Sequence, residues 1–318
     1  MLRYTTQRIV GIILILFITI SISFIILRMM PGSPFHDPML MPEIQQMMED
    51  KYHLNEPMRV QYGHFIKDVL KGDFGSSIKL QPNRPVFDII KEKVPVSLQL
   101  NIFSLIFTIP VGMAFGILAA LKKNTWIDTL LSLMVILFIS VPSFVFAALL
   151  QYFVAFKWDL LPILLSTEVT LTWTKFRSMI LPILSLSFGG IATITRYVRA
   201  ELSDALNSEY MLLAKTKGLS QVHATIKHAI RNSFIPLANV ILPMFLGILG
   251  GSLVIENIFG IPGVGQVMVQ AINARDHPLT IGVLLFYSAI SLSSILIIDL
   301  SYGIIDPRIR MGGGKSDN

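Results

Sequence analysis

Few residues of this chain have the types and spacing that catalysis requires. His223 and His228 are five positions apart, so on a helix they do not share one face as the two histidines of H-E-x-x-H do. Ser143 is not part of a G-x-S-x-G turn and has no suitably placed histidine partner. Cysteine is absent, which excludes a thiol nucleophile, a disulfide framework and a thiolate metal site. We therefore expect no catalytic residue, no metal ligand and no bound cofactor.

A glycine-rich segment, residues 260–265, is the closest approach to a phosphate-binding loop. Its sequence, G-I-P-G-V-G, lacks the lysine and the hydroxyl residue that contact phosphate and magnesium in G-x-x-x-x-G-K-[ST]. We interpret the segment as a re-entrant turn. Any energy from ATP must then come from another chain.

The most informative polar segment, residues 209–236, lies between two apolar runs. A helix is predicted from Arg196 to Gly218, with Gly218 as its stop and an apolar side of Leu202, Leu206 and Leu213. Ser220 is predicted to cap a second helix whose apolar face is Val222, Ile226, Ala229 and Ile230. Such a pair of helices can dock into the groove of a soluble partner. The alternative is a basic loop that rests on anionic lipid.

The composition places these segments beside a membrane. The chain is 53% hydrophobic and only 14% charged, against about a quarter charged in soluble domains. No cleavage site follows the first apolar run, so we expect an uncleaved anchor. Six runs are long enough to span a bilayer: Ile9–Leu27, Val96–Leu121, Leu130–Phe156, Met179–Tyr197, Leu237–Ile255 and Leu279–Ile305.

The net charge of +6 is spread over the loops, which indicates membrane orientation rather than a nucleic-acid surface. The short loops predicted outside carry only Lys157, Lys175, Arg177 and Arg275. The loops predicted to be cytoplasmic carry more lysine and arginine residues. Arg28, Lys91 and Lys93 count against this orientation, because they lie close to spans on the predicted outer side. Both termini are therefore expected to be cytoplasmic.

The loop of residues 31–95 is predicted to be folded. Pro57 can open a helix that Gly72 ends, with an apolar face of Tyr62, Phe65, Ile66, Val69 and Leu70. The helix forms a small cap in this interpretation. The alternative is a helix that lies on lipid headgroups.

Polar residues within the apolar runs are candidates for lining a pathway, because exposing them to lipid is costly. The candidates are Asn101, Ser140, Pro142, Ser143, Asn239 and Asp299, with Thr193 and Thr195. The hydroxyl and amide groups can equally bond a neighbouring helix or their own backbone. Asp299 is close to the inner end of the last run, where simple solvation is the favoured interpretation.

The polar segment resembles the cytoplasmic coupling loop of binding-protein-dependent ABC importer permeases. Leu212-Leu213-Ala214 stands at the family's Glu-Ala-Ala triplet, so the glutamate is missing. Gly218 is kept, and Phe234-Ile235-Pro236 stands for the Ile-x-Leu-Pro ending. The distance from Gly218 to Pro236 is similar to that of the oligopeptide and dipeptide branch, as are Glu209-Tyr210, Ala214-Lys215, Lys217-Gly218-Leu219 and Arg231-Asn232.

Other segments resemble the same branch in the same order along almost the whole chain. They are Pro31-Gly32-Ser33-Pro34, Leu54-Asn55-Glu56-Pro57, Gln61-Tyr62, residues 72–77, residues 140–144, residues 256–265, Asp299-Leu300 and residues 306–310. Each match alone is weak, but their number and order identify the chain as a member of this family.

The resemblance implies an all-α integral membrane protein with six transmembrane helices and the type I ABC importer permease fold, in the cell membrane. Its expected parts are residues 1–30 (N-terminus and first span), 31–95 (outer loop), 96–305 (permease core, with the coupling loop at about 199–236) and 306–318 (cytoplasmic tail). The chain would form half of a pathway for oligopeptides or dipeptides. Its expected partners are a second permease, two cytoplasmic ATPases that bind ATP and magnesium, and an outer substrate-binding protein. The implied ATPase-coupling residues are Glu209, Tyr210, Ala214, Lys215, Lys217, Gly218, Leu219, Arg231, Asn232 and Pro236.

Two alternatives stay open at this level. The same architecture carries nickel or another small solute in some branches of the family. A secondary transporter or channel driven by an ion gradient is less favoured, because such proteins place ionisable residues near the bilayer midplane and show internal repeats. The spans of this chain are nearly free of charge, and no repeat is apparent.

Overall fold

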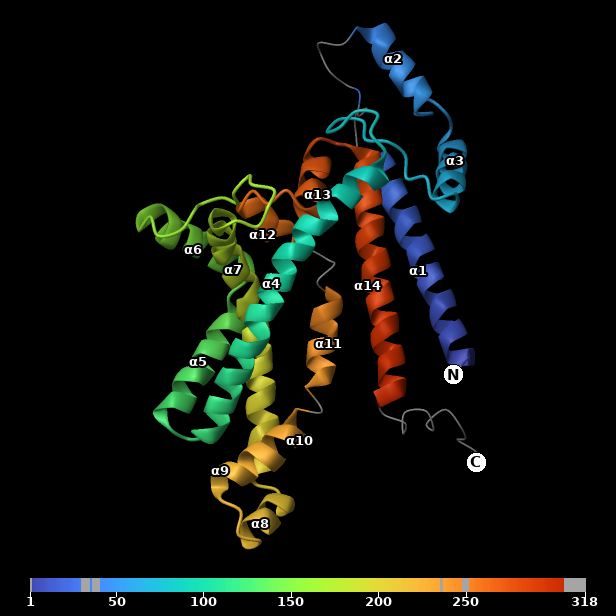
Figure 1. Cartoon of the computed structure of the whole chain (residues 1–318). Helices are drawn as coiled ribbons and strands as arrows, with labels where there is room; N and C mark the ends of the chain where they lie inside the picture. Colours follow the sequence, from blue (N-terminus) through green and yellow to red (C-terminus); the bar gives the residue numbers. More distant parts are fainter. Residues whose placement is uncertain (1, 30–34, 36–40, 235–236, 248–251, 306–318) are drawn as a thin grey trace. The chain divides into compact units, whose positions relative to one another are not determined.

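The computed structural model is all-helical over the residues that it describes, namely 2–29, 35, 41–234, 237–247 and 252–305 (Figure 1). Two compact units divide the chain: Met1–Pro95 with Pro262–Asn318, and Val96–Ile261. The first unit contains α1 (Leu2–Met29), α2 (Pro42–Lys51), α3 (Met58–Leu70), the start of α4 (Val86–Leu121), α13 (Val264–Asn273) and α14 (His277–Ile305). The second contains the rest of α4, α5 (Trp126–Ser140), α6 (Ser143–Leu150), the π-helix η1 (Gln151–Lys157), α7 (Trp173–Leu206), α8 (Glu209–Thr216), α9 (Gln221–Ala224), the π-helix η2 (Thr225–Ile230), α10 (Arg231–Ser233), α11 (Ala238–Gly247) and α12 (Leu253–Ile258).

Four helices of the described residues are long and apolar enough to cross a membrane. They are α1, α4, α7 and α14, which contain the first, second, fourth and sixth predicted runs. α4 begins at Val86 rather than at Val96. The reason is that Lys91, Glu92 and Lys93 interrupt the apolar run without interrupting the helix.

The third predicted run is two helices rather than one. α5 and the helix formed by α6 and η1 meet at an angle of 102°. Val141 and Pro142 separate them in extended conformations, since proline disfavours a helical residue before it. Counted as one broken span, the pair gives five candidate spans. The fifth predicted run includes α11 and the first half of α12, but residues 248–251 lie outside the described part, so the count of six stays a prediction.

The first unit is held by apolar contacts of α13 and α14 with the start of α4. α1 runs alongside α14 (Figure 1). Val86, Ile89 and Ile90 of α4 are buried in one cluster with residues of α13 and α14. A Cβ atom on Gly282 would lie 2.2 Å from Cγ1 of Val86, so the missing side chain is what permits this close approach.

The predicted cap helix is confirmed as α3, with Pro57 before its first residue and Gly72 at φ +78° just after its end. Its apolar face packs on residues of α1 and α14, namely Ile20, Ile281 and Leu285. The face therefore covers protein rather than lipid headgroups. Leu70 was wrongly assigned to it, since this side chain is 83% exposed. Leu70 lies about 80° around the helix from Tyr62, at the edge of the apolar stripe.

The turn before α4 is fixed by one buried carboxylate, Asp276, which precedes α14. Asp276 is 0% exposed and accepts a 2.5 Å hydrogen bond from Oγ of Ser77. It also accepts the backbone N–H groups of Ile78, Lys79 and Leu80 at 3.0–3.1 Å. Four donors far away in the sequence thus converge on one side chain, which anchors the turn to the start of α14.

The second unit is built around α7. α5 and α6 pack against it, and Figure 1 shows α8 to α10 near one end of α7 and α6 and α12 near the other. A Cβ atom on Gly116 of α4 would lie 2.6 Å from Cβ of Val198. α4 and α7 therefore approach closely where glycine faces α7, as small residues allow in membrane helices.

Candidate functional site

The predicted helix from Arg196 to Gly218 is broken in two. α7 ends at Leu206, Ser208 is extended, and α8 starts at Glu209. The amide of Asn207 donates to the carbonyl of Ser203 at 2.8 Å, and the hydroxyl of Ser208 donates to the carbonyl of Ala205 at 2.6 Å. Short polar side chains of this kind satisfy the last carbonyls of a helix, so the chain can turn here.

The predicted stop and start that follow are both confirmed. Gly218 has φ +86°, and the N–H of Leu219 donates to the carbonyl of Ala214 at 3.2 Å, as in a glycine-terminated helix. Oγ of Ser220 accepts from the N–H of His223 at 3.3 Å and caps α9. The segment continues through η2 and α10.

Alanines and one large side chain, Met211, pack this segment against α7. Met211, Ala214, Ala224 and Ala229 are buried in a cluster with Leu202 and Ala205. The predicted apolar faces are therefore partly wrong, because Leu213, Val222 and Ile226 are 55%, 68% and 62% exposed. The π-helix η2 also departs from the 3.6-residue period on which the prediction rested.

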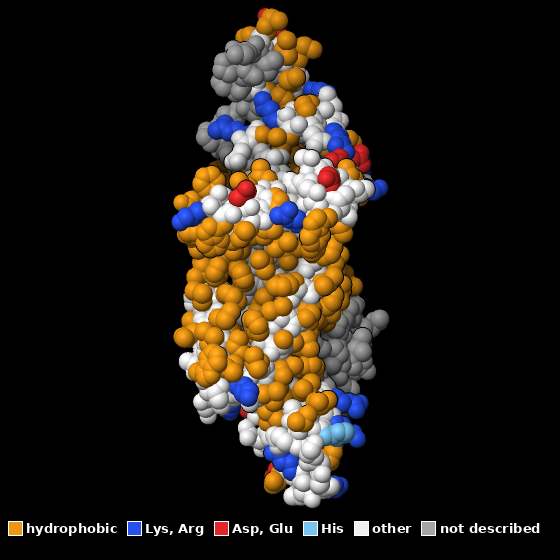
Figure 2. All heavy atoms as spheres, turned by 60° about the vertical axis from the view of Figure 1, so that its left-hand side comes forward, with side chains coloured by type: hydrophobic (Ala, Val, Ile, Leu, Met, Phe, Trp, Pro, Cys, Tyr) orange, Lys and Arg blue, Asp and Glu red, His pale blue; other side chains and the backbone are white. Residues whose placement is uncertain are grey.

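The result is a mixed apolar and basic surface, here termed the loop surface. It comprises Tyr210, Leu212, Leu213, Val222 and Ile226 with the exposed bases Lys215, Lys217, Lys227 and Arg231. Figure 2 shows Lys, Arg and His side chains gathered with hydrophobic ones at the lower end of this unit. Leu212 is 65% exposed. A monomer in water has no folding reason to expose large apolar side chains together, so such a patch marks an interaction site.

Most residues predicted for coupling lie on this exposed side. Those exposed are Glu209, Tyr210, Lys215, Lys217, Gly218, Arg231 and Asn232. Ala214 is buried and Leu219 is half-buried, so these two shape the helices. Pro236 lies outside the described residues. Leu212 was not named on either predicted apolar face, although it is exposed, and the exposed Val222 and Ile226 do not share a face with the buried Ala229.

α7 is tied to the first turn of α5 by an ion pair that sequence reasoning did not find. Asp128 accepts Nε of Arg199 at 2.6 Å and Nη2 at 2.8 Å. Its Oδ2 also accepts the N–H of Asn124 at 3.0 Å. The Asp128 side chain is 6% exposed and that of Arg199 is 35% exposed. Two parallel bonds of this kind fix the direction of Arg199, and hence the part of α7 that precedes the loop surface.

Asp128→Ala is expected to destabilise the chain by about 3 kcal/mol, because it leaves a half-buried guanidinium without its partner. Thermal unfolding in detergent measures the effect. Glu92→Ala is the control, since its pair with Arg84 is exposed on both sides and is worth about 1 kcal/mol or less. Equal losses in the two variants would refute the anchoring role of Asp128.

The pathway candidates divide between two cavities of the second unit. One, of about 260 Å³, is lined by Asn101, Ser104, Leu105, Thr108, Leu186, Gly190, Met244 and Gly247. The other, of about 400 Å³, is lined by Pro142, Ser143 and Thr193 with Phe138, Phe146 and Phe188. Ser140 is exposed and is absent from both linings. The side chains of Asn239 and Asp299 lie outside the described part of the structure.

Several hydroxyl groups bond to protein. Thr193 donates to the carbonyl of Gly189 at 2.9 Å, Thr195 donates to that of Gly112 at 3.2 Å, and the hydroxyls of Ser104 and Ser187 are 3.0 Å apart. Thr193 thus bonds to the backbone of its own helix, and the other groups bond between helices. The larger cavity has an aromatic wall that the sequence did not reveal, with the ring centroids of Phe138 and Phe188 4.6 Å apart.

Comparison with known proteins shows which protein family this chain resembles. The family model described as "Binding-protein-dependent transport system inner membrane component" matches residues 112–311. The model of the N-terminal part of the same transport-system membrane component matches residues 1–101.

Relatives match over nearly the entire chain. The dipeptide transport system permease protein DppB of Lactococcus lactis is 37% identical over 98% of this chain and 100% of its own length. DppB of Bacillus subtilis is 35% identical over 98% and 99%, and the oligopeptide transport system permease protein OppB of Haemophilus influenzae is 36% identical over 98% and 100%. A weaker likeness, with a TM-score of 0.49 and 17% identity over 67% of this chain and 96% of the other, is to a structure of the MetNI methionine ABC transporter.

The two matched segments together cover most of both units and the whole loop surface. With several membrane-length helices and relatives of equal length, the chain is a multi-pass membrane protein. It belongs to the family of binding-protein-dependent transport system inner membrane components.

Proposed function

We propose that the chain is a permease subunit of an ATP-driven ABC importer for peptides and that it forms half of the translocation pathway. The relatives named above are dipeptide and oligopeptide permeases of the same length, which supports a peptide substrate. The chain itself is proposed to be non-catalytic, with ATP and magnesium bound by two partner ATPases. A second permease and an outer substrate-binding protein complete the assembly.

The loop surface is the observation that carries the coupling role. Its exposed apolar residues lie among four bases, which suits docking into a groove of a cytoplasmic ATPase. η2 and α10 pack against α7, and α8 and α9 pack against η2, so a push on this surface is transmitted to a membrane-length helix. Closure of two ATPases around ATP can thereby switch the pathway between its outward and inward openings.

The proposal includes six spans, the type I importer fold and both termini in the cytoplasm. The broken pair α5 and α6–η1 would be the third span, and α11 with α12 the fifth. Residues 41–85 would then lie outside, where α2 and α3 can face the binding protein. The polar cavity that Asn101 lines and the aromatic cavity at Pro142 are the proposed pathway segments.

The test is purification of the tagged chain from native membranes in mild detergent, followed by mass spectrometry and uptake of labelled peptides. We expect a second permease, two P-loop ATPases and peptide uptake that requires ATP. Recovery of this chain alone or as a homodimer, with transport that continues without ATP, would overturn the proposal in favour of an ion-driven transporter. Uptake that ignores peptides and follows nickel or another small solute would overturn the peptide part alone.

A further inference from the structure

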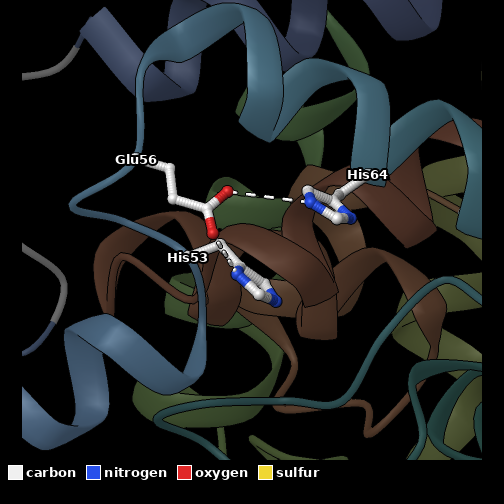
Figure 3. Close-up of side chains that lie close together, drawn as sticks. All are labelled: His53, Glu56 and His64. Atoms are coloured by element: carbon white, nitrogen blue, oxygen red, sulfur yellow. Dashed lines mark hydrogen bonds and ion pairs between the residues drawn. The ribbon is translucent and has the colours of Figure 1, made fainter.

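Three side chains with metal-binding atoms converge where α2 leads into α3. They are His53 in the turn after α2, Glu56 just before α3, and His64 on α3 (Figure 3). Nδ1 of His53 is 2.8 Å from Oε1 of Glu56, and Nε2 of His64 is 3.7 Å from Oε2. One ligand atom of each residue lies within 4.8 Å of the other two. The two rings therefore approach one carboxylate from two separate elements.

The backbone holds this arrangement in place. His53 has φ +57°, and the N–H of Leu54 donates to the carbonyl of Glu49 at 2.8 Å, which closes α2. Nε2 of Gln61 on α3 donates to the carbonyls of Leu54 and Glu56 at 3.0 and 2.7 Å. The turn that carries His53 and Glu56 is thus tied to the helix that carries His64.

The carboxylate and the two rings lie close enough together to share one ligand. The rings of His53 and His64 are stacked 4.8 Å apart and 9° from parallel, so one ring has to turn about its χ angles before both nitrogens point at the same ion. In the part of the chain that the structure describes, Oε2 of Glu56 is enclosed and accepts no hydrogen bond. An enclosed carboxylate oxygen without a donor is costly, and a cation at this point would satisfy it.

We propose that His53, Glu56 and His64 bind a divalent transition-metal ion of the zinc class. Two imidazole nitrogens and one carboxylate oxygen form a ligand set typical of zinc, with water in the fourth position. Bonds of about 2.0–2.2 Å place tetrahedral ligands about 3.3 Å apart. The two His–Glu separations lie on either side of this value, and all three ligand atoms lie within 4.8 Å of one another, so rotation of exposed side chains can bring them to one ion. The side chains are 51%, 36% and 49% exposed, so an ion can reach them from water.

The bound ion links the turn after α2 to α3. α3 itself packs on α1 and α14, so the metal extends that packing to α2 and makes the cap more rigid. The sequence expectation of no metal ligand is revised by this proposal. The ligands have the spacing H-x-x-E-x₇-H across a helix boundary, which no single-helix motif detects.

The experiment titrates Zn²⁺ into the full-length purified protein, carrying a tag without histidine, by calorimetry, and follows Co²⁺ by its visible absorption. We expect one strong site in the wild type and Co²⁺ bands typical of a tetrahedral site. His53→Gln, His64→Gln and Glu56→Gln are each expected to weaken Zn²⁺ binding about 10-fold or more, since each loses one of three ligands. Glu43→Gln, an exposed carboxylate change on α2, is the control and should bind Zn²⁺ as the wild type does.

A second measurement is independent of affinity. Trypsin cleavage after Lys51, two residues before His53, should become several-fold slower with Zn²⁺ in the wild type and in Glu43→Gln, and EDTA should reverse the effect. In Glu56→Gln the rate should not respond to Zn²⁺. Equal Zn²⁺ binding by the wild type and the three ligand variants, with all proteins eluting as folded species, would overturn the proposal.

Discussion

Val222→Asp combined with Ile226→Asp is expected to reduce ATP-dependent peptide uptake about 10-fold or more and to release the ATPases from the purified complex. Both side chains are more than half exposed on the loop surface, so the folded chain loses little by the change. Docking would bury both apolar side chains, and each burial contributes about 1.5 kcal/mol or more to the docking free energy. The aspartate variant loses this contribution and must also bury two charges. A loss of about 3 kcal/mol corresponds to about 100-fold weaker docking. Uptake into vesicles and recovery of the ATPases measure the result.

The matched control is Val169→Asp with Leu171→Asp, in the loop before α7. These side chains are 92% and 51% exposed and receive the same chemical change, but they lie far along the chain from the loop surface. ATPase recovery should match the wild type. Val222→Leu with Ile226→Leu should also retain it, because the apolar area is kept. If the aspartate pair at 222 and 226 left ATPase recovery intact, the loop surface would be a lipid-facing patch instead of a docking site.

Asp276→Ala is expected to destabilise the first unit by about 3–5 kcal/mol and to remove most folded protein from the membrane. The carboxylate is fully buried and accepts the hydroxyl of Ser77, itself buried, and three backbone N–H groups, so its loss removes four hydrogen bonds at once. Asp276→Asn keeps the shape but turns one acceptor into a donor, so an intermediate loss is expected. Fluorescence-detected size exclusion and trypsin cleavage after Lys79 report the folded fraction and the freed turn.

The control for Asp276→Ala is Asp73→Ala. Asp73 lies just before the same turn and makes one exposed hydrogen bond there, in which it accepts the N–H of Gly75 at 2.8 Å. Asp73→Ala should cost about 1 kcal/mol. Ser77→Ala, which removes one of the four donors, should have a similarly small effect. An Asp276→Ala protein as stable as Asp73→Ala would show that the turn does not depend on the buried carboxylate.

The sequence by itself determined the family, the helical class and the places where local chemistry acts alone. The predicted helix ends are confirmed at Gly218 and Gly72, which have positive φ, at Ser220, which caps a helix, and at Pro57, which precedes one. These effects depend only on the residue itself and on its near neighbours in the sequence. The apolar runs also located the membrane-length helices, because the ability of a helix to span a bilayer depends on the length and apolarity of its own continuous segment.

Tertiary structure decided which side of each short helix is exposed. Val222 and Ile226 have the larger apolar area, yet Ala224 and Ala229 are the buried residues, in one cluster with Leu202 and Ala205 of α7. It also decided the long-range polar pairs. Asp128 meets Arg199, Asp276 meets residues 77–80, and His53 meets His64 only through the path of the folded chain, and no spacing in the sequence encodes those distances.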